Sequence, residues 1–388
     1  MVDRLSPLEI MTRLVSFPTV SSDTNLPLVE WTADYLSSHG IEHYIWIDPE
    51  QPEKAGLYAH VGPKIDGGVL LSGHTDVVPV AGQDWTSDPF VVVERDGKYF
   101  GRGCVDMKGF DALALWAMVE GHYADLQRPL QLAYTFDEEI GCTGAPPLIA
   151  QMQKHLPKAE AVVVGEPSML KAVTGHKGAF AMATHVRGFE VHSSLMHQGV
   201  SAVMEAARVI DWANHRNTEN RAKPQTEVAA MFTPPWTTVH VGKVSGGTAH
   251  NITAGDCNFW MDFRAVPGEN LEDWQSQYEA EIARIEAEMQ AVSPQSGISI
   301  EKVFSVPGLV PEMDGAAETL VRTLTGDNAR HVVSYGTEAG HYQVAGYSAV
   351  VCGPGDIAQA HQADEFITVQ QFEAGTQFMR DLVKRLAA

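Results

Sequence analysis

The sequence predicts an α/β fold, a mostly parallel sheet with helices on both faces, into which a smaller α+β domain is inserted. Three observations support this prediction. The chain has 388 residues, which is typical of two domains or of one large domain with an insertion. Short apolar runs alternate with helical patterns in the first half of the chain. Near Gly178 the order changes to strand, helix, strand, strand and a long charged helix. We therefore expect 1–177 and 296–388 to form the α/β domain and 178–295 the inserted domain.

The N-terminal elements have clear boundary signals. Ser6 is a predicted N-cap, Pro7 stands at the first helical position and Glu9 at the capping-box position, so a helix should run to about Phe17. Pro18 ends this helix. A second helix is expected at 28–39, closed by Gly40. Two strands are expected to follow at 41–47 and 56–61.

The rest of the α/β domain repeats the alternation of strands and helices. The run from Gly68 to Gly73 is short, rich in branched residues and bounded by glycines, as buried strands often are. The further strands are expected at 130–136, 161–164 and 348–352, and the further helices at 110–123, at 147–155 and from about 369.

The inserted domain has a different pattern. Its strands are expected at 179–186, 238–244 and 257–264, and its helices at 200–214 and 270–292. The last of these helices has acidic residues near its start and Arg284 later, as the helix dipole prefers.

The charge of the chain limits the classes of partner. The formal net charge is −22, and clustered Lys and Arg, on which phosphate binding depends, are lacking. No nucleic-acid partner is therefore expected. The acidity is compatible with a cationic small substrate or bound metal ions, although solubility accounts for most of it.

The cysteines and the N-terminus indicate a cytoplasmic protein. Cys104, Cys142, Cys257 and Cys352 lie far apart and form no C-x-x-C pair, so neither a disulfide framework nor a thiolate zinc site is predicted. The N-terminal segment is polar, and no run approaches the roughly 18 apolar residues of a membrane span. We expect a soluble, unexported protein without membrane contact.

One histidine and two aspartates lie at the ends of predicted elements. His74 follows the strand at 68–73, and strand ends of open α/β sheets are where ligands usually bind. Asp76 lies two residues on, where its carboxylate can orient the His74 ring or accept its N–H. Asp106 lies just before the predicted helix at 110–123. The alternative is a histidine in an ordinary turn.

Further carboxylates follow other predicted strands. Asp137, Glu138 and Glu139 are adjacent after one strand, so their mutual repulsion should raise their pKa values unless a cation is bound. A solvated acidic turn is the alternative. Glu166 ends another apolar strand and His361 follows a third, which favours metal binding.

The candidate ligands outnumber the needs of one ion. His74, His361, Asp106, Glu139 and Glu166 are five, more than a single tetrahedral zinc requires. If one carboxylate bridges, they can hold two ions with positions left open for water. Histidine with carboxylate and without thiolate suits zinc, and leaves cobalt or manganese possible.

Taken in order, several segments closely resemble the M20 family of dinuclear zinc aminoacylases and carboxypeptidases, most of all its acetylornithine deacetylase branch. The resemblance spans nearly the whole chain. The segments that carry it are 72–79, 85–90, 101–109, 137–145, 165–168, 175–178, 246–251, 335–340 and 353–366.

The resemblance implies a role for each candidate. Asp106 would bridge two zinc ions, His74 and Glu166 would complete one site, and Glu139 and His361 the other. Glu138 looks like the general base that deprotonates the metal-bridging water, and Asp76 like the partner of His74.

The inserted domain would be a lid and dimerisation domain. His192 matches a histidine that, in homodimers of the family, reaches the neighbouring subunit's site and stabilises the tetrahedral intermediate. Asn251 and Arg264 match residues that bind the substrate carboxylate. The family usually has Val/Ile-Pro after that asparagine, and this chain departs from the pattern with Ile252-Thr253-Ala254.

The implied reaction is hydrolysis of an N-acyl amino acid, foremost N-acetyl-L-ornithine to L-ornithine and acetate, as in arginine biosynthesis. Glu338 could meet a cationic substrate side chain, or be an acid at a helix N-terminus. The alternatives are a succinyl-diaminopimelate desuccinylase, another N-acyl or N-formyl amidohydrolase of the family, and a non-catalytic binding protein of the same fold. The non-catalytic binding protein is disfavoured because the five ligands and Glu138 are all present. Serine chemistry is disfavoured because the motif G-x-S-x-G is absent.

Overall fold

The computed structural model describes residues 4–388. The first three residues of the N-terminal segment, which is expected to be polar, lie outside the described residues. The chain divides into two compact units. Unit 1 contains the residues up to 175 together with 311–332 and 337–388, and unit 2 contains 176–310 and 333–336. The division differs from the expected return to the first domain at residue 296. The strand β13 (Gly297–Val306) pairs along β9 (Gly178–Arg187), so the chain leaves unit 2 only after that strand.

The main sheet has eight strands in the order β1-β2-β6-β3-β7-β15-β8-β14. The central strands β6, β3, β7 and β15 are parallel to one another, whereas β1, β2 and β8 pair antiparallel with their neighbours. The strands are β1 (Glu42–Ile47), β2 (Ala55–Val61), β3 (Val69–His74), β6 (Leu130–Thr135), β7 (Ala161–Pro167), β8 (Val173–His176), β14 (His331–Val333) and β15 (Ser348–Gly353).

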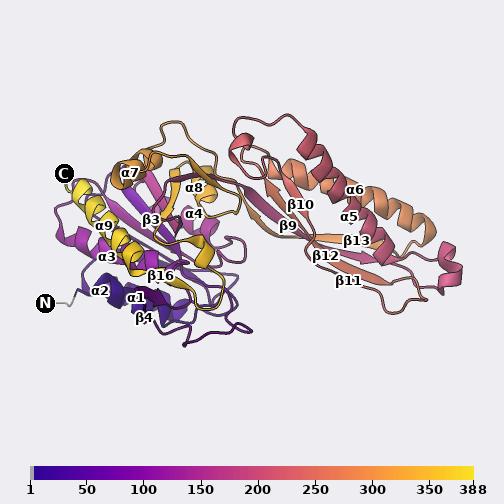
Figure 1. The fold of residues 1–388 in the computed structure, drawn as a ribbon, viewed down its shortest axis with the longest axis horizontal. Helices are drawn as coiled ribbons and strands as arrows, with labels where there is room; N and C mark the ends of the chain where they lie inside the picture. The colour runs from indigo at the N-terminus through magenta and orange to yellow at the C-terminus, as the bar shows by residue number, and fades with distance from the viewer. Residues whose placement is uncertain (1–3) are drawn as a thin grey trace. The chain divides into compact units, whose positions relative to one another are not determined.

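Helices cover both faces of this sheet (Figure 1). Five helices share one apolar core with it: α1 (Pro7–Val15), α2 (Leu26–Ser38), α3 (Lys108–Tyr123), α7 (Ala316–Thr325) and α9 (Val369–Leu386). The opposite face carries α4 (Ala145–His155) and α8 (Ala339–Val344). There Leu148 packs directly on Gly56, and the hydroxyl groups of Tyr342 and Ser72 are 2.9 Å apart. The predicted fold class is confirmed, with mixed pairing at the sheet edges.

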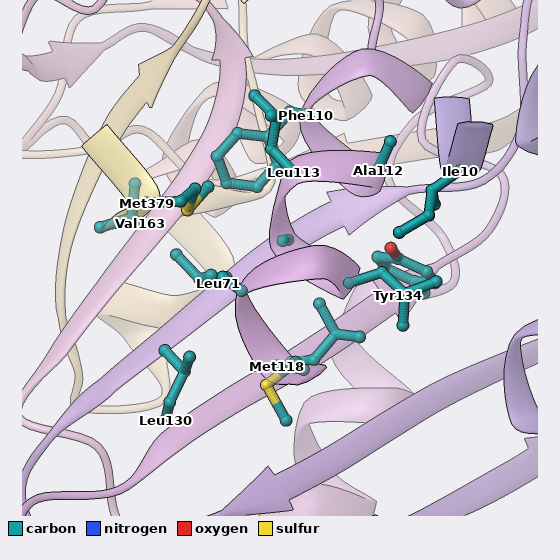
Figure 2. Close-up of a cluster of buried hydrophobic side chains, with 14 of the residues drawn as sticks. Ile10, Leu71, Phe110, Ala112, Leu113, Met118, Leu130, Tyr134, Val163 and Met379 are labelled. Carbon is teal, nitrogen blue, oxygen red and sulfur yellow. The ribbon is translucent and has the colours of Figure 1, made fainter. Parts of the chain in front are cut away.

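The core of unit 1 fixes the helix that follows Asp106. Figure 2 shows Phe110 and Leu113 of α3 packed among Leu71, Val163 and Met379, all of them fully or almost fully buried. Burying one large apolar side chain contributes about 1.5–3 kcal/mol. Most of α3 is buried, so its position is set by packing around the whole helix.

The N-terminal signals are realised as expected. The Ser6 hydroxyl accepts the backbone N–H of Glu9, and the Glu9 carboxylate accepts the backbone N–H of Ser6, which completes the capping box of α1. Gly40 follows α2 with φ 76°, a left-handed conformation that glycine adopts without steric cost.

A small second sheet was not predicted. It consists of β4 (Val93–Arg95), β5 (Lys98–Phe100) and β16 (Phe366–Thr368), with β5 in the middle. Phe366 pairs with Phe100 in the register of β16 and β5. This pairing brings the segment after His361 beside the segment that leads to Asp106. The short helix η3 (Ile357–Gln359) precedes His361.

Unit 2 is an antiparallel sheet covered on one face by two helices. The sheet order is β10-β12-β9-β13, and β11 also pairs with β12. The helices α5 (Ala202–Ala222) and α6 (Leu271–Val292) run side by side over it (Figure 1). The predicted strand at 238–244 is replaced by β10 (Thr238–His240) and β11 (Val244–Gly246), while β12 (Asp256–Ala265) matches its prediction. Two short helices, η1 (Ser193–Gln198) and η2 (Ala229–Met231), complete the unit. Among residues 4–388, no helix is long and apolar enough to cross a membrane.

Candidate metal centre

The carboxyl ends of three parallel strands bring most of the candidate ligands together. His74 is the last residue of β3 and lies opposite Thr135, the last residue of β6, so the acidic turn begins beside it. Ser72 lies opposite Val164 of β7, two residues before Glu166. Because parallel strands end at the same edge, side chains from distant parts of the sequence meet there.

Asp106 lies between two histidines. One of its carboxylate oxygens is 3.2 Å from Nε2 of His74, and the other is 3.0 Å from Nε2 of His361. A second carboxylate approaches the same ring nitrogen of each histidine. Glu166 Oε1 is 3.6 Å from His74 Nε2, and Glu139 Oε2 is 3.0 Å from His361 Nε2. The structure thus brings all five predicted ligands together, with Asp106 shared between two halves of the cluster.

The titration of this cluster is governed by burial and by the histidine contacts. Burial raises the pKa of Glu139 to about 7 and raises the pKa values of Glu138 and Glu166 well above the usual range, with neighbouring carboxylates adding to the effect. Burial acts in the same direction on Asp106, but hydrogen bonds from His361 and His74 hold its pKa well below the usual range. Hydrogen bonds to Asp106 and Glu139 raise the pKa of His361 to about 10.

These side chains fit a pair of divalent cations. Among the described residues, Glu139 Oε1 and Glu166 Oε1 are buried oxygens without a hydrogen-bond partner. A buried carboxylate oxygen without a partner is costly, and a cation satisfies it. Two triads, His74 with Asp106 and Glu139, and His74 with Glu138 and Glu166, each have ligand atoms within 4.8 Å of one another. Nitrogen and oxygen donors without thiolate suit zinc, cobalt or manganese.

Asp76 holds the acidic turn as well as His74. The His74 Nδ1 atom is 2.9 Å from the backbone carbonyl oxygen of Asp76 and 3.5 Å from its carboxylate. The carboxylate accepts the backbone N–H groups of Glu138 and Glu139, at 3.1 and 3.3 Å, and the hydroxyl of Ser21, at 2.7 Å. The side chain predicted to orient the histidine therefore also anchors the two glutamates.

Lys54 is a buried cation beside the same turn, and sequence reasoning missed it. Its ammonium group is 2.7 Å from Asp137 Oδ1 and also donates to the carbonyl oxygen of Ser21. The side chains of Lys54 and Asp137 are 3% and 1% exposed. Asp137 has φ 56°, a left-handed conformation that is unusual for a residue with a side chain. The ion pair holds the turn in this conformation.

Replacing Lys54 with methionine is expected to destabilise the protein by about 3 kcal/mol, because it leaves the Asp137 carboxylate buried without its partner. Urea unfolding measures the loss. The matched control is Lys64→Met, which removes an ion pair with Glu42 from an exposed site and should cost less than about 1 kcal/mol. Equal unfolding midpoints for the two variants would contradict the role given to Lys54.

Glu338 lies next to this cluster but is almost completely covered, with 1% exposure. Burial raises its pKa to about 7, a rise that a hydrogen bond with Thr135 opposes. The residue precedes α8, yet its side chain makes no capping hydrogen bond. The carboxylate interacts electrostatically with His74 and Asp76 of the cluster.

The other predicted substrate residues lie in unit 2. The exposed ring of His192 caps η1, with Nδ1 2.9 Å from the Ser194 hydroxyl. Asn251 is far from His192 in the sequence but lies beside the same segment in space, because its carbonyl oxygen accepts the backbone N–H of Ser193. Arg264 is on β12, and its Nε donates to Asp262 at 3.0 Å, so part of the guanidinium is already engaged.

A second buried ion pair near the ligands was also missed. The Glu365 carboxylate accepts the backbone N–H groups of Val105 and Asp106, and it pairs with Arg102 at 2.7 Å. The glutamate occurs four residues after His361, a spacing that gave no chemical signal in the sequence. Only the pairing of β16 with β5 brings it to Asp106.

The family of the chain follows from comparison with known proteins. Residues 70–385 match the model of peptidase family M20/M25/M40, which is well over half of the chain. The chain belongs to this family. It is therefore a metal-dependent hydrolase, and the cluster at the strand ends is the candidate metal centre of an M20 enzyme.

Several relatives are similar over nearly their whole length. An acetylornithine deacetylase of Myxococcus xanthus is 34% identical over 371 residues, covering 93% of this chain and 92% of the relative. An acetylornithine deacetylase of Proteus mirabilis is 32% identical and covers 97% of this chain and 96% of the relative.

Two solved structures share the fold at lower identity. An M20 family metallo-carboxypeptidase from Sulfolobus solfataricus has a TM-score of 0.77 at 16% identity, covering 99% of both chains. A tripeptidase from Staphylococcus aureus has a TM-score of 0.74 at 18% identity, covering 100% of this chain and 99% of the other. These similarities support the two-unit architecture of the M20 fold.

Proposed function

We propose that this M20 enzyme hydrolyses the amide bond of N-acetyl-L-ornithine, releasing L-ornithine and acetate in arginine biosynthesis. The observation that carries the hydrolytic part is the shared position of Asp106, which presents one oxygen to each of two histidines. The choice of substrate rests on the names of relatives that are 30% or more identical over nearly the full chain.

The chain's residues would hold two ions in two neighbouring sites. His74 and Glu166 would complete one site, His361 and Glu139 the other, and Asp106 would serve both. When bound, two such ions supply Lewis acidity that activates water and polarises an amide carbonyl. Zinc is the proposed metal, and cobalt or manganese are possible substitutes.

Glu138 is the proposed general base. It lies beside the ligand Glu139, and its carboxylate is 3.4 Å from Cys142 Sγ. Burial raises the pKa of Glu138 well above the usual range of glutamate, and the neighbouring carboxylates act in the same direction. The Glu138 carboxylate would accept a proton from the attacking water and then deliver it to the leaving amine.

The test is hydrolysis of a small panel by the purified, zinc-loaded protein. N-acetyl-L-ornithine, N-succinyl-L,L-diaminopimelate, an N-formyl amino acid and N-acetyl-L-methionine should be compared, each with a chelated control. The proposal predicts the highest kcat/KM for N-acetyl-L-ornithine and none after chelation. Activity on the succinyl substrate with none on N-acetyl-L-ornithine would overturn the choice of substrate but keep the metal hydrolase.

His192 and a homodimer belong to the same proposal, together with Asn251 and Arg264 as contacts of the substrate carboxylate. The imidazole of His192 would donate to the oxyanion that develops in the site of a second copy. Mixing equal amounts of Glu138→Gln and His192→Ala subunits is then expected to restore up to about a quarter of the activity, because about half of the dimers are mixed and each mixed dimer contains one intact site of two. Mixtures as inactive as the separate variants would contradict a composite site.

A further inference from the structure

A chain of polar contacts in unit 1 connects the backbones of two proposed ligands, Asp106 and His361. It begins at Glu365, whose Oε1 accepts the backbone N–H of Val105 at 3.0 Å and of Asp106 at 3.1 Å. The other carboxylate oxygen of Glu365 accepts from Arg102 Nη1 at 2.7 Å. The side chains of Glu365 and Arg102 are each 1% exposed.

The contacts continue from Arg102 to the loop of His361. Arg102 Nη2 donates to Gln83 Oε1 at 2.5 Å, and Gln83 Nε2 donates to the carbonyl oxygen of His361 at 3.0 Å. The indole N–H of Trp85 also donates to Gln83 Oε1 at 3.1 Å. Since the oxygen of the Gln83 amide accepts two hydrogen bonds, the orientation of the amide is set and its nitrogen must face His361.

Both ends of this chain lie in irregular backbone. Asp106 stands between β5 and α3, and His361 stands between η3 and β16 with φ 64°. A residue with a side chain pays a steric cost in that left-handed conformation, on the order of 1 kcal/mol, so the neighbouring contacts must hold it. Regular secondary structure does not set the distance between these two residues.

Stability alone does not account for a buried ion pair here. Removing both charges from water costs several kcal/mol per ion, and a well-packed apolar pair of similar volume is often as stable or more so. Glu365 uses three acceptor contacts on two oxygens, and two of the three donors are the backbone of Asp106 and its neighbour. Most of the hydrogen bonds of Glu365 therefore hold the backbone segment that carries Asp106.

We propose that Glu365 is a positioning residue of the metal centre, acting through Asp106 on one side and through Arg102 and Gln83 on His361. It is not one of the five proposed ligands. By holding both backbones, it sets how far the Asp106 carboxylate lies from the His361 imidazole. This inference rests on the proposed dinuclear site.

The two ends of the chain of contacts make different predictions for the two ions. Glu365→Gln has one acceptor oxygen, which cannot serve both Arg102 and the two backbone N–H groups. Because Asp106 is shared, this variant should weaken the binding of both zinc ions, each by about 10- to 100-fold, the usual effect of losing a residue that supports a ligand. Gln83→Leu removes the hydrogen bond to His361 and one acceptor of Arg102, but it leaves the contacts of Glu365 with Arg102 Nη1 and with the backbone of Asp106 in place. It should therefore weaken one ion by about 10-fold and leave the other nearly unchanged.

The experiment is a Zn²⁺ titration of the metal-free full-length protein against a chromophoric chelator, which resolves two binding steps. The visible spectrum of the Co²⁺-loaded protein reports ligand geometry independently of turnover, and urea unfolding of the metal-free protein reports stability. The matched control is Glu160→Gln, which makes the same replacement in the exposed ion pair with Arg128. It should leave the Zn²⁺ affinities, the Co²⁺ spectrum and the urea unfolding midpoint unchanged.

Each outcome decides one of the two proposals. If the wild-type protein binds no Zn²⁺, the proposed metal hydrolase fails. If the wild type binds two ions and folded Glu365→Gln binds both with unchanged affinity, only the positioning role is overturned. If Glu365→Gln does not fold, Gln83→Leu tests the positioning role. Unchanged Zn²⁺ affinities and an unchanged cobalt spectrum in Gln83→Leu would show that these contacts serve stability alone and would overturn the positioning role.

Discussion

Glu138→Gln is expected to keep both metal ions and to lose hydrolytic activity by about 100-fold or more, the usual scale for removal of a general base. The amide has nearly the shape of the carboxylate but does not accept a proton at neutral pH. The backbone N–H of Glu138 still donates to Asp76, so the turn that carries Glu139 should stay in place. Metal content by atomic emission and kcat on N-acetyl-L-ornithine are the two measurements.

The metal content also separates two roles for Glu138. Its carboxylate lies close enough to His74 and Glu166 to serve as a ligand. A variant that loses one ion together with its activity would identify Glu138 as a ligand, and a variant with near wild-type turnover would remove it from the mechanism. Glu30→Gln, at an exposed glutamate of α2, is the matched control and should behave as the wild type.

Asp106→Ala is expected to lose more than half of the bound metal and all measurable activity. Asp106 contacts both histidines of the cluster, so its removal takes a ligand from both proposed sites at once. The same change leaves the two imidazoles facing an empty space where the carboxylate stood, which raises the cost of holding two cations near each other.

The Asp106 prediction is checked by metal content after dialysis against a fixed concentration of free zinc. Asp34→Ala, at an exposed aspartate of α2, provides the matched control. His361→Ala offers a useful comparison, because it takes a ligand from only one of the proposed sites and should leave about one ion bound. If Asp106→Ala binds two ions at normal affinity, the shared position of this carboxylate has no metal-binding role.

Much of the candidate centre could be predicted from the sequence, since its side chains follow apolar strands directly. His74, Glu139 and Glu166 each occur at or just after the end of a strand of the parallel sheet, and apolar runs bounded by turn residues identify such ends. The supporting residues gave no such signal. Lys54 and Glu365 lie in polar segments where a charged residue is ordinarily solvated, and both are buried here.

The boundary of the second unit shows the same limit. The sequence predicts a return to the α/β domain at residue 296, whereas the pairing of β13 with β9 keeps residues 297–306 in unit 2. A one-dimensional pattern contains the period of a strand and the place where it ends. It does not contain the identity of the neighbouring strand.

The sequence by itself determined the type and order of most elements, and the strand ends at which chemistry was to be expected, because these depend on local apolar periodicity and turn residues. Only the tertiary structure decided which side chains meet. The contact of Asp76 with Glu138 spans 62 residues and that of Glu365 with Asp106 spans 259. Such contacts exist because β3 lies beside β6 and because β16 pairs with β5, and these pairings are set by the packing of the whole unit.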